Sequence, residues 1–277
     1  MRIVIRTSRS AIWARRLSSV ALPLLILPVI MHRERLLDSA AFLPVILFAG
    51  IVAALTVLVS IFALGRLWHT GDQGWSRALA GLFLGGLCLA PFLWYASRAM
   101  TYPPVTDIAT IARAELPLVF EPDTAQLPPP KVLTQTEQQR LFPNATTRTY
   151  PLDIIQLFAL VDRMVQAQGW DVRQRREPIE AGEIGRINAR IITIPGWREE
   201  AVLRVTEIEG GSAVDMRSAS IGAPHDFGSN GSRIARFMVT LDNEVTTLLR
   251  DNPNVNQPVA EEDDEPAPTV ETGTAGN

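Results

Sequence analysis

Residues 39–64 read SAAFLPVILFAGIVAALTVLVSIFAL, twenty-six positions without a charged side chain. A helix needs about 20 apolar residues to cross the hydrocarbon core of a bilayer, and this stretch is long enough. A helix that is apolar on every side has no face suited to water. The sequence therefore predicts a membrane protein, whose first partner is the lipid bilayer.

Two further apolar segments flank this one. Residues 78–96 are of spanning length, whereas residues 17–31 correspond to only about 22 Å of helix and contain Pro23 and Pro28. We interpret the short segment as a third span; a re-entrant segment and the core of a signal peptide are the alternatives. With three spans, residues 1–98 form an α-helical membrane anchor.

The arginines predict an orientation, because cytoplasmic flanks of spans are enriched in basic residues. If all three segments span, the arginines that flank the spans divide into seven on the N-terminal side and four on the other. We then expect a multi-pass protein of the inner (plasma) membrane with its N-terminus in the cytoplasm and its C-terminal domain outside it. If the first segment does not span, the domain lies in the cytoplasm. The seven are Arg2, Arg6, Arg9, Arg15, Arg16, Arg66 and Arg77, and the four are Arg33, Arg35, Arg98 and Arg113.

Charge and composition exclude several classes of function. The formal net charge is −3, which argues against a nucleic-acid partner. One cysteine, Cys88, permits neither an intrachain disulfide nor a multi-cysteine zinc site, and the three histidines are widely scattered. The loop at residues 228–231 lacks the Gly-Lys-Ser/Thr of a phosphate-binding loop. We expect no metal and no cofactor.

Beyond the spans the composition changes twice. Residues 99–150 contain many prolines, which oppose long helices, so we predict an extended linker partly laid along the following domain. Residues 151–250 show regular periodicity and are predicted to form a soluble domain. Residues 251–277 are acidic and lack apolar periodicity, which predicts a disordered tail.

The soluble domain is predicted to be an α+β two-layer sandwich. Apolar residues at helical spacing indicate two amphipathic helices, one between Pro151 and Gly169 and one from about Ile234 to Leu248. Between them lie four strand-like runs separated by glycine-containing turns, which predicts a four-stranded antiparallel meander flanked by the two helices. The runs are 170–175, 186–194, 200–207 and 212–220.

Several polar residues recur at a spacing typical of one family. Asp215-Met216-Arg217-Ser218-Ala219-Ser220, the loop Asp226-Phe227-Gly228-Ser229-Asn230, and Arg233-Ile234 at the start of the last helix carry the pattern. In these motifs residues 100–250 resemble the domain-of-unknown-function family 1499 (DUF1499). The resemblance implies membrane or extracytoplasmic placement and a three-span front end, but it implies no reaction.

The same residues are the candidate site. A glycine-rich turn before a helix presents backbone N–H groups, and Arg217, Arg233, Ser218 and Asn230 could hold an anionic lipid or envelope ligand there. The alternative is a structural polar cluster: Asp226 and Asn230 cap the helix, while Arg217 and Arg233 pair with Asp215 and Asp226.

Two other functions stay open. A hydrolase would use His225 with Ser218 or Ser220, although no Gly-x-Ser-x-Gly turn surrounds either serine, so we assign no catalytic residue. A structural or interaction protein of the envelope would instead hold a membrane or envelope protein partner on an exposed apolar patch. The sequence thus favours a non-enzymatic binding or structural module.

Overall fold

The computed structural model describes residues 7–119, 129–180 and 182–252. Three long helices come first, and strands with short helices follow. The elements are α1 (Arg9–Arg33), α2 (Ser39–Thr70), α3 (Trp75–Thr101), β1 (Asp107–Ala109), the 3-10 helix η1 (Arg113–Glu115), α4 (Gln135–Leu141), β2 (Arg148–Tyr150), α5 (Ile154–Ala167), β3 (Asp171–Arg176), β4 (Gly185–Ile192), β5 (Arg198–Ile208), β6 (Gly211–Ile221) and α6 (Ser229–Asp251).

The three N-terminal helices are each long and apolar enough to cross a membrane, as the sequence predicts. They pack through small residues, because a Cβ on Gly81 would lie 2.7 Å from the Ser60 hydroxyl and 3.0 Å from Ala14. The side chain of Asp38 accepts a hydrogen bond from Ala41 N (2.8 Å) and caps α2. Most large apolar side chains of α1–α3 face outward, as they do on helices surrounded by lipid.

In the part of the domain that the structure describes, the strands form one antiparallel sheet in the order β1-β6-β5-β4-β3, with β2 also paired to β6. The prediction of four strands is therefore incomplete, since the described residues form six. The four predicted runs correspond to β3–β6. The two additional strands are three residues long and come from the proline-containing segment before Pro151, too short to show an alternating pattern.

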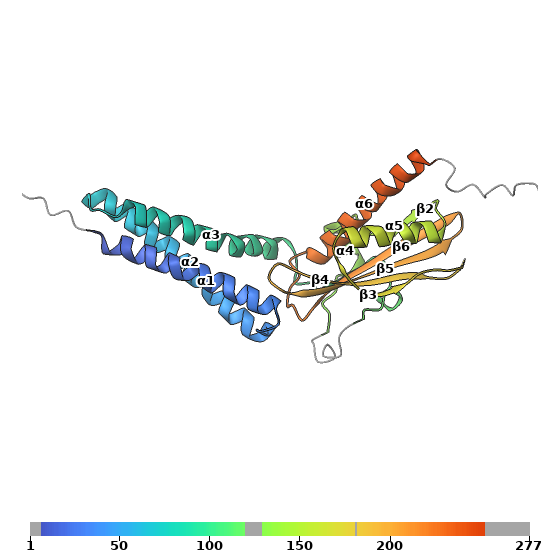
Figure 1. The fold of residues 1–277 in the computed structure, drawn as a ribbon, viewed down its shortest axis with the longest axis horizontal. Coiled ribbons are helices and arrows are strands. Elements are labelled where there is room, and N and C mark those ends of the chain that lie inside the picture. The colour runs from blue at the N-terminus through green and yellow to red at the C-terminus, as the bar shows by residue number, and fades with distance from the viewer. Residues whose placement is uncertain (1–6, 120–128, 181, 253–277) are drawn as a thin grey trace, which may run out of the picture.

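Helices α5 and α6 cover one face of this sheet and enclose the main core (Figure 1). The apolar stripe of α6 that the sequence shows is buried there, including Ile234, Met238 and Leu241. The opposite face is covered in part by the chain after β1, where Leu116 packs on Ala109 and Val202. The sheet thus has two buried faces, each with its own polar residues. The predicted disordered tail lies outside the described residues, apart from Asp251 and Asn252.

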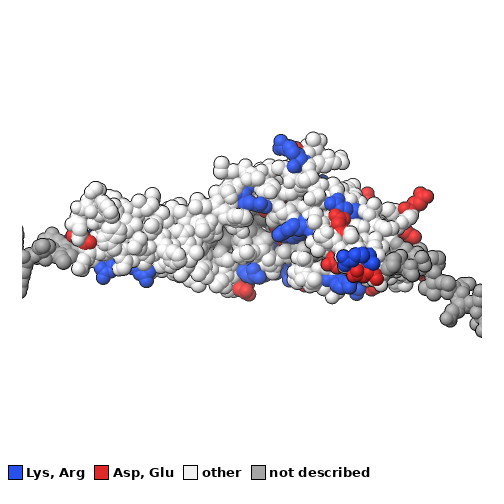
Figure 2. Space-filling model, turned by 90° about the horizontal axis from the view of Figure 1, so that it is seen from above, with Lys and Arg blue, Asp and Glu red and all other residues white. Residues whose placement is uncertain are grey.

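The helices and the domain lie end to end (Figure 1). Because α1, α2 and α3 alternate in direction, the end of α1, the start of α2 and the end of α3 meet the domain, while the start of α1 lies at the far end. Figure 2 shows the helical part mostly free of charged side chains between its far end and the domain. The region where the helix ends and the domain loops touch is called the junction below.

Candidate functional site

Three of the predicted site residues, Ser218, Asn230 and Arg233, form one hydrogen-bonded cluster between β6 and α6. The Ser218 hydroxyl donates to Asn230 Oδ1 (2.8 Å), and Arg233 Nη1 donates to Ser218 Oγ (2.7 Å) and Asn230 Oδ1 (3.2 Å). Arg233 Nη2 forms an ion pair with Glu199, which is 2% exposed. Glu199 also accepts from Ser220 Oγ (3.1 Å) and Ser229 Oγ (2.7 Å). The guanidinium of Arg233 is thus committed to protein partners, chiefly a buried carboxylate that the sequence analysis did not single out.

Asp226 caps the last helix, as the structural interpretation predicts. Its carboxylate accepts from Gly228 N (2.8 Å) and Asn230 N (3.2 Å) at the start of α6. Burial raises the pKa of the Asp226 carboxyl above its ordinary value, and the negative charge of Glu199 acts in the same direction, against the two N–H groups that lower it. Asn230 does not cap the helix with its side chain; it binds Ser218, Ser220 and the Thr106 carbonyl instead.

Arg217 lies on the other face of the sheet. Successive strand residues point to opposite faces, so Arg217 and Ser218 cannot share a site. Arg217 Nε and Nη2 donate to Asp107 (3.0 and 2.8 Å), and Nη1 donates to the Leu116 carbonyl (2.9 Å). Asp107 is fully buried and also accepts from Arg113 Nε (3.1 Å). The predicted pairing of Arg217 with Asp215 is wrong; Asp107, on β1, is the partner.

Asp215 holds the segment that precedes the domain. Its Oδ1 accepts from the hydroxyls of Thr110 (3.1 Å) and Thr147 (2.6 Å), which flank the two short strands beside β6. Asp215 is therefore a structural residue, although its contacts differ from those expected. The predicted ligand residues are divided between two faces and bonded to protein groups, so their role in binding stays a prediction.

The residues proposed for hydrolysis do not meet. His225 Nδ1 accepts a hydrogen bond from Phe227 N (2.8 Å), and the nearest carboxylate oxygen of Asp226 is 3.9 Å away. The Ser218 hydroxyl donates to Asn230 and the Ser220 hydroxyl to Glu199. Across the residues that the structure describes, no serine bonds to this histidine, and no group of three or more His, Cys, Asp or Glu could hold a metal ion.

One domain loop at the junction is the β4–β5 turn, which binds the end of α1. His32 Nδ1 lies 2.7 Å from the Pro195 carbonyl oxygen, and its Nε2 lies 3.2 Å from Ser39 Oγ. The His32 ring stacks on Phe42 with ring centroids 4.2 Å apart and meets Trp197 edge-on at 4.9 Å. Gly196 fits against this histidine, because a Cβ there would lie 2.8 Å from His32 Nδ1. The turn therefore follows the shape of the helix end.

The second domain loop connects β6 to α6 and binds the end of α3. Arg98 Nε donates to the Phe227 carbonyl (3.0 Å), and the Tyr95 ring meets the Phe227 ring edge-on at 4.9 Å. Phe227 has a φ of 53°, uncommon for a residue with a side chain. Stacking on His225, at 4.4 Å, helps to hold it there. Such backbone strain persists only where surrounding contacts impose it, and at Phe227 those contacts come from α3 and from His225.

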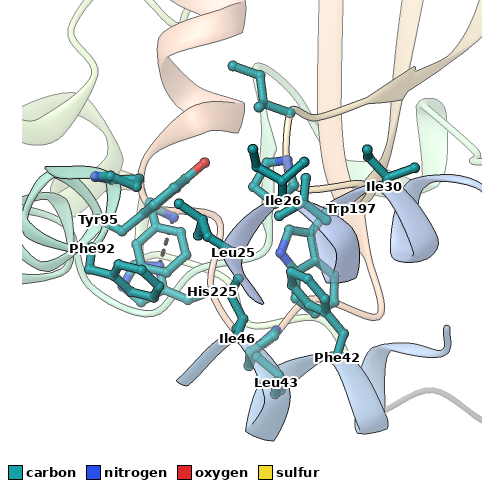
Figure 3. A pocket seen from close by; sticks show the side chains of 16 residues that line it. Leu25, Ile26, Ile30, Phe42, Leu43, Ile46, Phe92, Tyr95, Trp197 and His225 are labelled. Atoms are coloured by element: carbon teal, nitrogen blue, oxygen red, sulfur yellow. Dashed lines mark hydrogen bonds between the residues drawn. The ribbon is translucent and has the colours of Figure 1, made fainter. Parts of the chain in front are cut away.

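Between these two loops and the three helices lies a cavity of about 420 Å³, called the junction cavity. Figure 3 shows Phe92, Tyr95 and His225 on one side of it and Phe42 and Trp197 on the other. The rest of its lining is also apolar: Leu25, Ile26, Val29, Ile30, Leu43, Ile46, Pro91, Ile194, Pro195, Pro224 and Phe227. Its size is typical of small-molecule pockets.

Three polar donors belong to this apolar lining. They are the Tyr95 hydroxyl, the Trp197 indole N–H and Nε2 of His225. Because His225 Nδ1 accepts the Phe227 N–H, the neutral ring carries its proton on Nε2. Among the described residues none of the three donors has a hydrogen-bond partner within the protein, and none is a fully buried unsatisfied atom. The cavity therefore offers donors to an occupant with acceptor oxygens.

Sequence reasoning missed this cavity because its walls come from five separate segments. The only available signals were Trp197 after the Pro195-Gly196 turn and the aromatic residues near the span ends, which are equally typical of interfacial anchoring.

The fold defines the class: a protein with three helices able to span a membrane, followed by a domain with a six-stranded antiparallel sheet. Residues 123–241 match the family described as Protein of unknown function (DUF1499), which confirms the resemblance noted from the motifs. No curated protein matches the chain.

Proposed function

We propose that this protein is a membrane-anchored binding module that holds a membrane lipid in the junction cavity. The observation that carries the proposal is the cavity itself, an apolar space lined jointly by the domain-facing ends of all three helices and by two domain loops. An apolar pocket with a few convergent polar groups is the usual form of a small-molecule site. Binding suits this site better than catalysis, because His225 touches no serine among the described residues.

A lipid is the occupant that fits the position and the chemistry. The lining residues from α1–α3 lie near the ends of helices whose outer surfaces carry exposed apolar side chains. Acyl chains in a surrounding bilayer are therefore available beside the cavity without passing through water. The donors Tyr95, Trp197 and His225 match the ester carbonyl oxygens that follow the acyl chains in a glycerolipid.

We further propose that the protein resides in the inner (plasma) membrane with its domain outside the cytoplasm. The support is the distribution of the arginines that flank the spans, with seven on the N-terminal side of a three-span arrangement and four on the domain side. A reporter that is active only outside the cytoplasm, fused after Asp251, is expected to be active. An expressed but inactive fusion would contradict this orientation and leave the lipid proposal standing.

The lipid proposal is tested by filling the cavity. Ile46 lines it, whereas the adjacent Leu47 is 64% exposed and points away. We expect native mass spectrometry of the full chain, extracted in mild detergent, to show one lipid retained by the wild type and by Leu47→Trp. Ile46→Trp is expected to lose this lipid at an unchanged melting temperature. Equal retention in both variants would show that the lipid is bound elsewhere, and the proposal would fail.

A further inference from the structure

Two arginines stand at the junction, one for each domain loop that lines the cavity. Arg33, the last residue of α1, donates from Nη1 to the Thr193 carbonyl (3.3 Å) in the β4–β5 turn. Arg98, in the last turn of α3, donates from Nε to the Phe227 carbonyl (3.0 Å) in the other loop. Each arginine therefore approaches the cavity rim from a helix end and touches a loop that contributes to the lining.

Neither guanidinium is neutralised by the domain. In the described part of the chain, no carboxylate lies within ion-pair distance of Arg33 or Arg98. The contrast with Arg217 and Arg233 is clear, because both of those bind buried carboxylates. Arg98 also stacks over the Tyr102 ring at 4.4 Å, which orients its guanidinium without offsetting the charge. Two positive charges thus remain available beside an apolar cavity.

We infer that the junction cavity selects an anionic phospholipid, with Arg33 and Arg98 contacting its phosphate headgroup. This inference rests on the proposed lipid-binding function. Each part of an anionic phospholipid has a matching part of the site. The acyl chains match the apolar walls, the ester carbonyls match the hydrogen-bond donors, and the negative headgroup matches the two arginines. Guanidinium groups form charge-assisted hydrogen bonds to phosphate oxygens, and an arginine near a membrane surface favours anionic lipid by about fivefold.

The test compares two lipids of equal chain length. The full-length protein is stripped of lipid in mild detergent and supplied with phosphatidylglycerol and phosphatidylcholine in equal amounts, and native mass spectrometry gives the ratio bound. We expect the wild type to favour phosphatidylglycerol by roughly 25-fold if each of the two arginines contributes about fivefold. The double variant Arg33→Gln/Arg98→Gln is expected to bring the ratio close to one.

Two further variants keep the test interpretable. Arg33→Lys/Arg98→Lys retains both charges and is expected to keep most of the preference, which separates charge from folding. Arg236→Gln is the matched control, because Arg236 is an exposed arginine that also donates from Nε to a backbone carbonyl, that of Ser232 (3.2 Å). We expect it to leave the ratio unchanged.

The outcomes distinguish this inference from the function on which it rests. If the wild type retains lipid that Ile46→Trp loses, but without preference between the two headgroups, the anionic selectivity is wrong and lipid binding stands. If the preference persists in Ile46→Trp, the anionic lipid lies on the outer helix surface and the inference fails. If the wild type retains no lipid that Ile46→Trp loses, both fail.

Discussion

Arg217 and Arg233 are sixteen positions apart in the sequence and neutralise carboxylates on opposite faces of one sheet. Arg217 binds Asp107, which is fully buried, and Arg233 binds Glu199, which is 2% exposed. A buried carboxylate is tolerated only when a partner and hydrogen bonds compensate for the lost water. The polar motif around residue 217 is therefore explained first by the pairing of buried carboxylates on the two faces of the sheet.

Removing the Arg217 guanidinium should leave Asp107 as a buried charge supported mainly by the more exposed Arg113. We expect Arg217→Met to lower the free energy of unfolding by about 3–5 kcal/mol, measured by chemical denaturation in detergent. Adding Asp107→Asn should recover part of the loss, because the uncompensated charge is then absent. A double variant no more stable than Arg217→Met would show that packing, and not charge, sets the cost.

Asp226 gives stability a pH dependence of defined sign. Its pKa is raised by burial first and by Glu199 next, so the folded state holds the proton more tightly than the unfolded state. This contribution is fully present below the ordinary aspartate pKa of about 3.9 and is lost as pH rises through the raised value. We expect the melting temperature of the wild type, relative to Asp226→Asn, to fall between pH 4 and pH 7.

A control separates this effect from general titration. Asp153→Asn makes the same substitution at another helix cap, the exposed N-cap carboxylate of α5. If the wild-type advantage over Asp226→Asn instead grows toward pH 7, the hydrogen bonds from Gly228 and Asn230 outweigh desolvation.

The sequence predicted which side chains lie together only for residues that are close to one another along the chain. Ser218, Asn230 and Arg233 lie within sixteen positions of one another and meet, as the turn between β6 and α6 requires. Asp107 is 110 positions from Arg217, and several nearer carboxylates were equally plausible partners. The choice is made by strand register, which places Asp107 opposite Ala219, and a single sequence does not reveal that register.

Among the elements, the long ones were predictable and the short ones were not. The four predicted strands agree with β3–β6 within two residues at each end, because their length and glycine turns give a clear pattern. Strands β1 and β2 have three residues each and are held by pairing with β6 rather than by their own propensity. The proline-containing segment is for this reason part of the sheet and more than a linker.

Gly211 tests how closely β2 approaches β6. A Cβ at this position would lie 2.1 Å from the Tyr150 carbonyl oxygen, at the end of β2. We expect Gly211→Ala to separate the two strands, with a loss of about 2 kcal/mol or more and faster hydrogen exchange at residues 148–150. Gly210→Ala is the matched control, because nothing lies within 4 Å of its Cβ position. Similar exchange in both variants would show that β2 tolerates the displacement.

For the whole molecule, the decisive feature is how the domain is held on the helices. The contacts of His32 with Pro195 and of Arg98 with Phe227 join positions more than 120 residues apart. Neither pattern nor propensity predicts them, because each involves a loop and a helix end whose relative position is set by the complete fold. The two loops that make these contacts both line the junction cavity, so the proposed function rests on this arrangement.

Gly196 is the position at which the arrangement can be disturbed with the least change elsewhere. A Cβ there would lie 2.8 Å from both His32 Nδ1 and Arg33 N. Gly182 also has a positive φ, 85° against 94°, but nothing lies within 4 Å of its Cβ position. Alanine at either site is expected to lower the free energy of unfolding by a similar amount, about 1 kcal/mol, because its backbone must adopt a positive φ. Gly196→Ala alone should therefore loosen the domain from the helices.

We expect hydrogen exchange to rise at residues 34–38 and 193–197 in Gly196→Ala, while the sheet strands stay protected and Gly182→Ala matches the wild type in both loops. The same variant should lose the lipid that Ile46→Trp loses, because a separated junction no longer encloses a cavity. Increased exchange with undiminished lipid retention would place the lipid among the helices alone. If hydrogen exchange in Gly196→Ala is unchanged, the turn accommodates the added methyl group. The Arg98–Phe227 contact then determines how the domain is held on the helices.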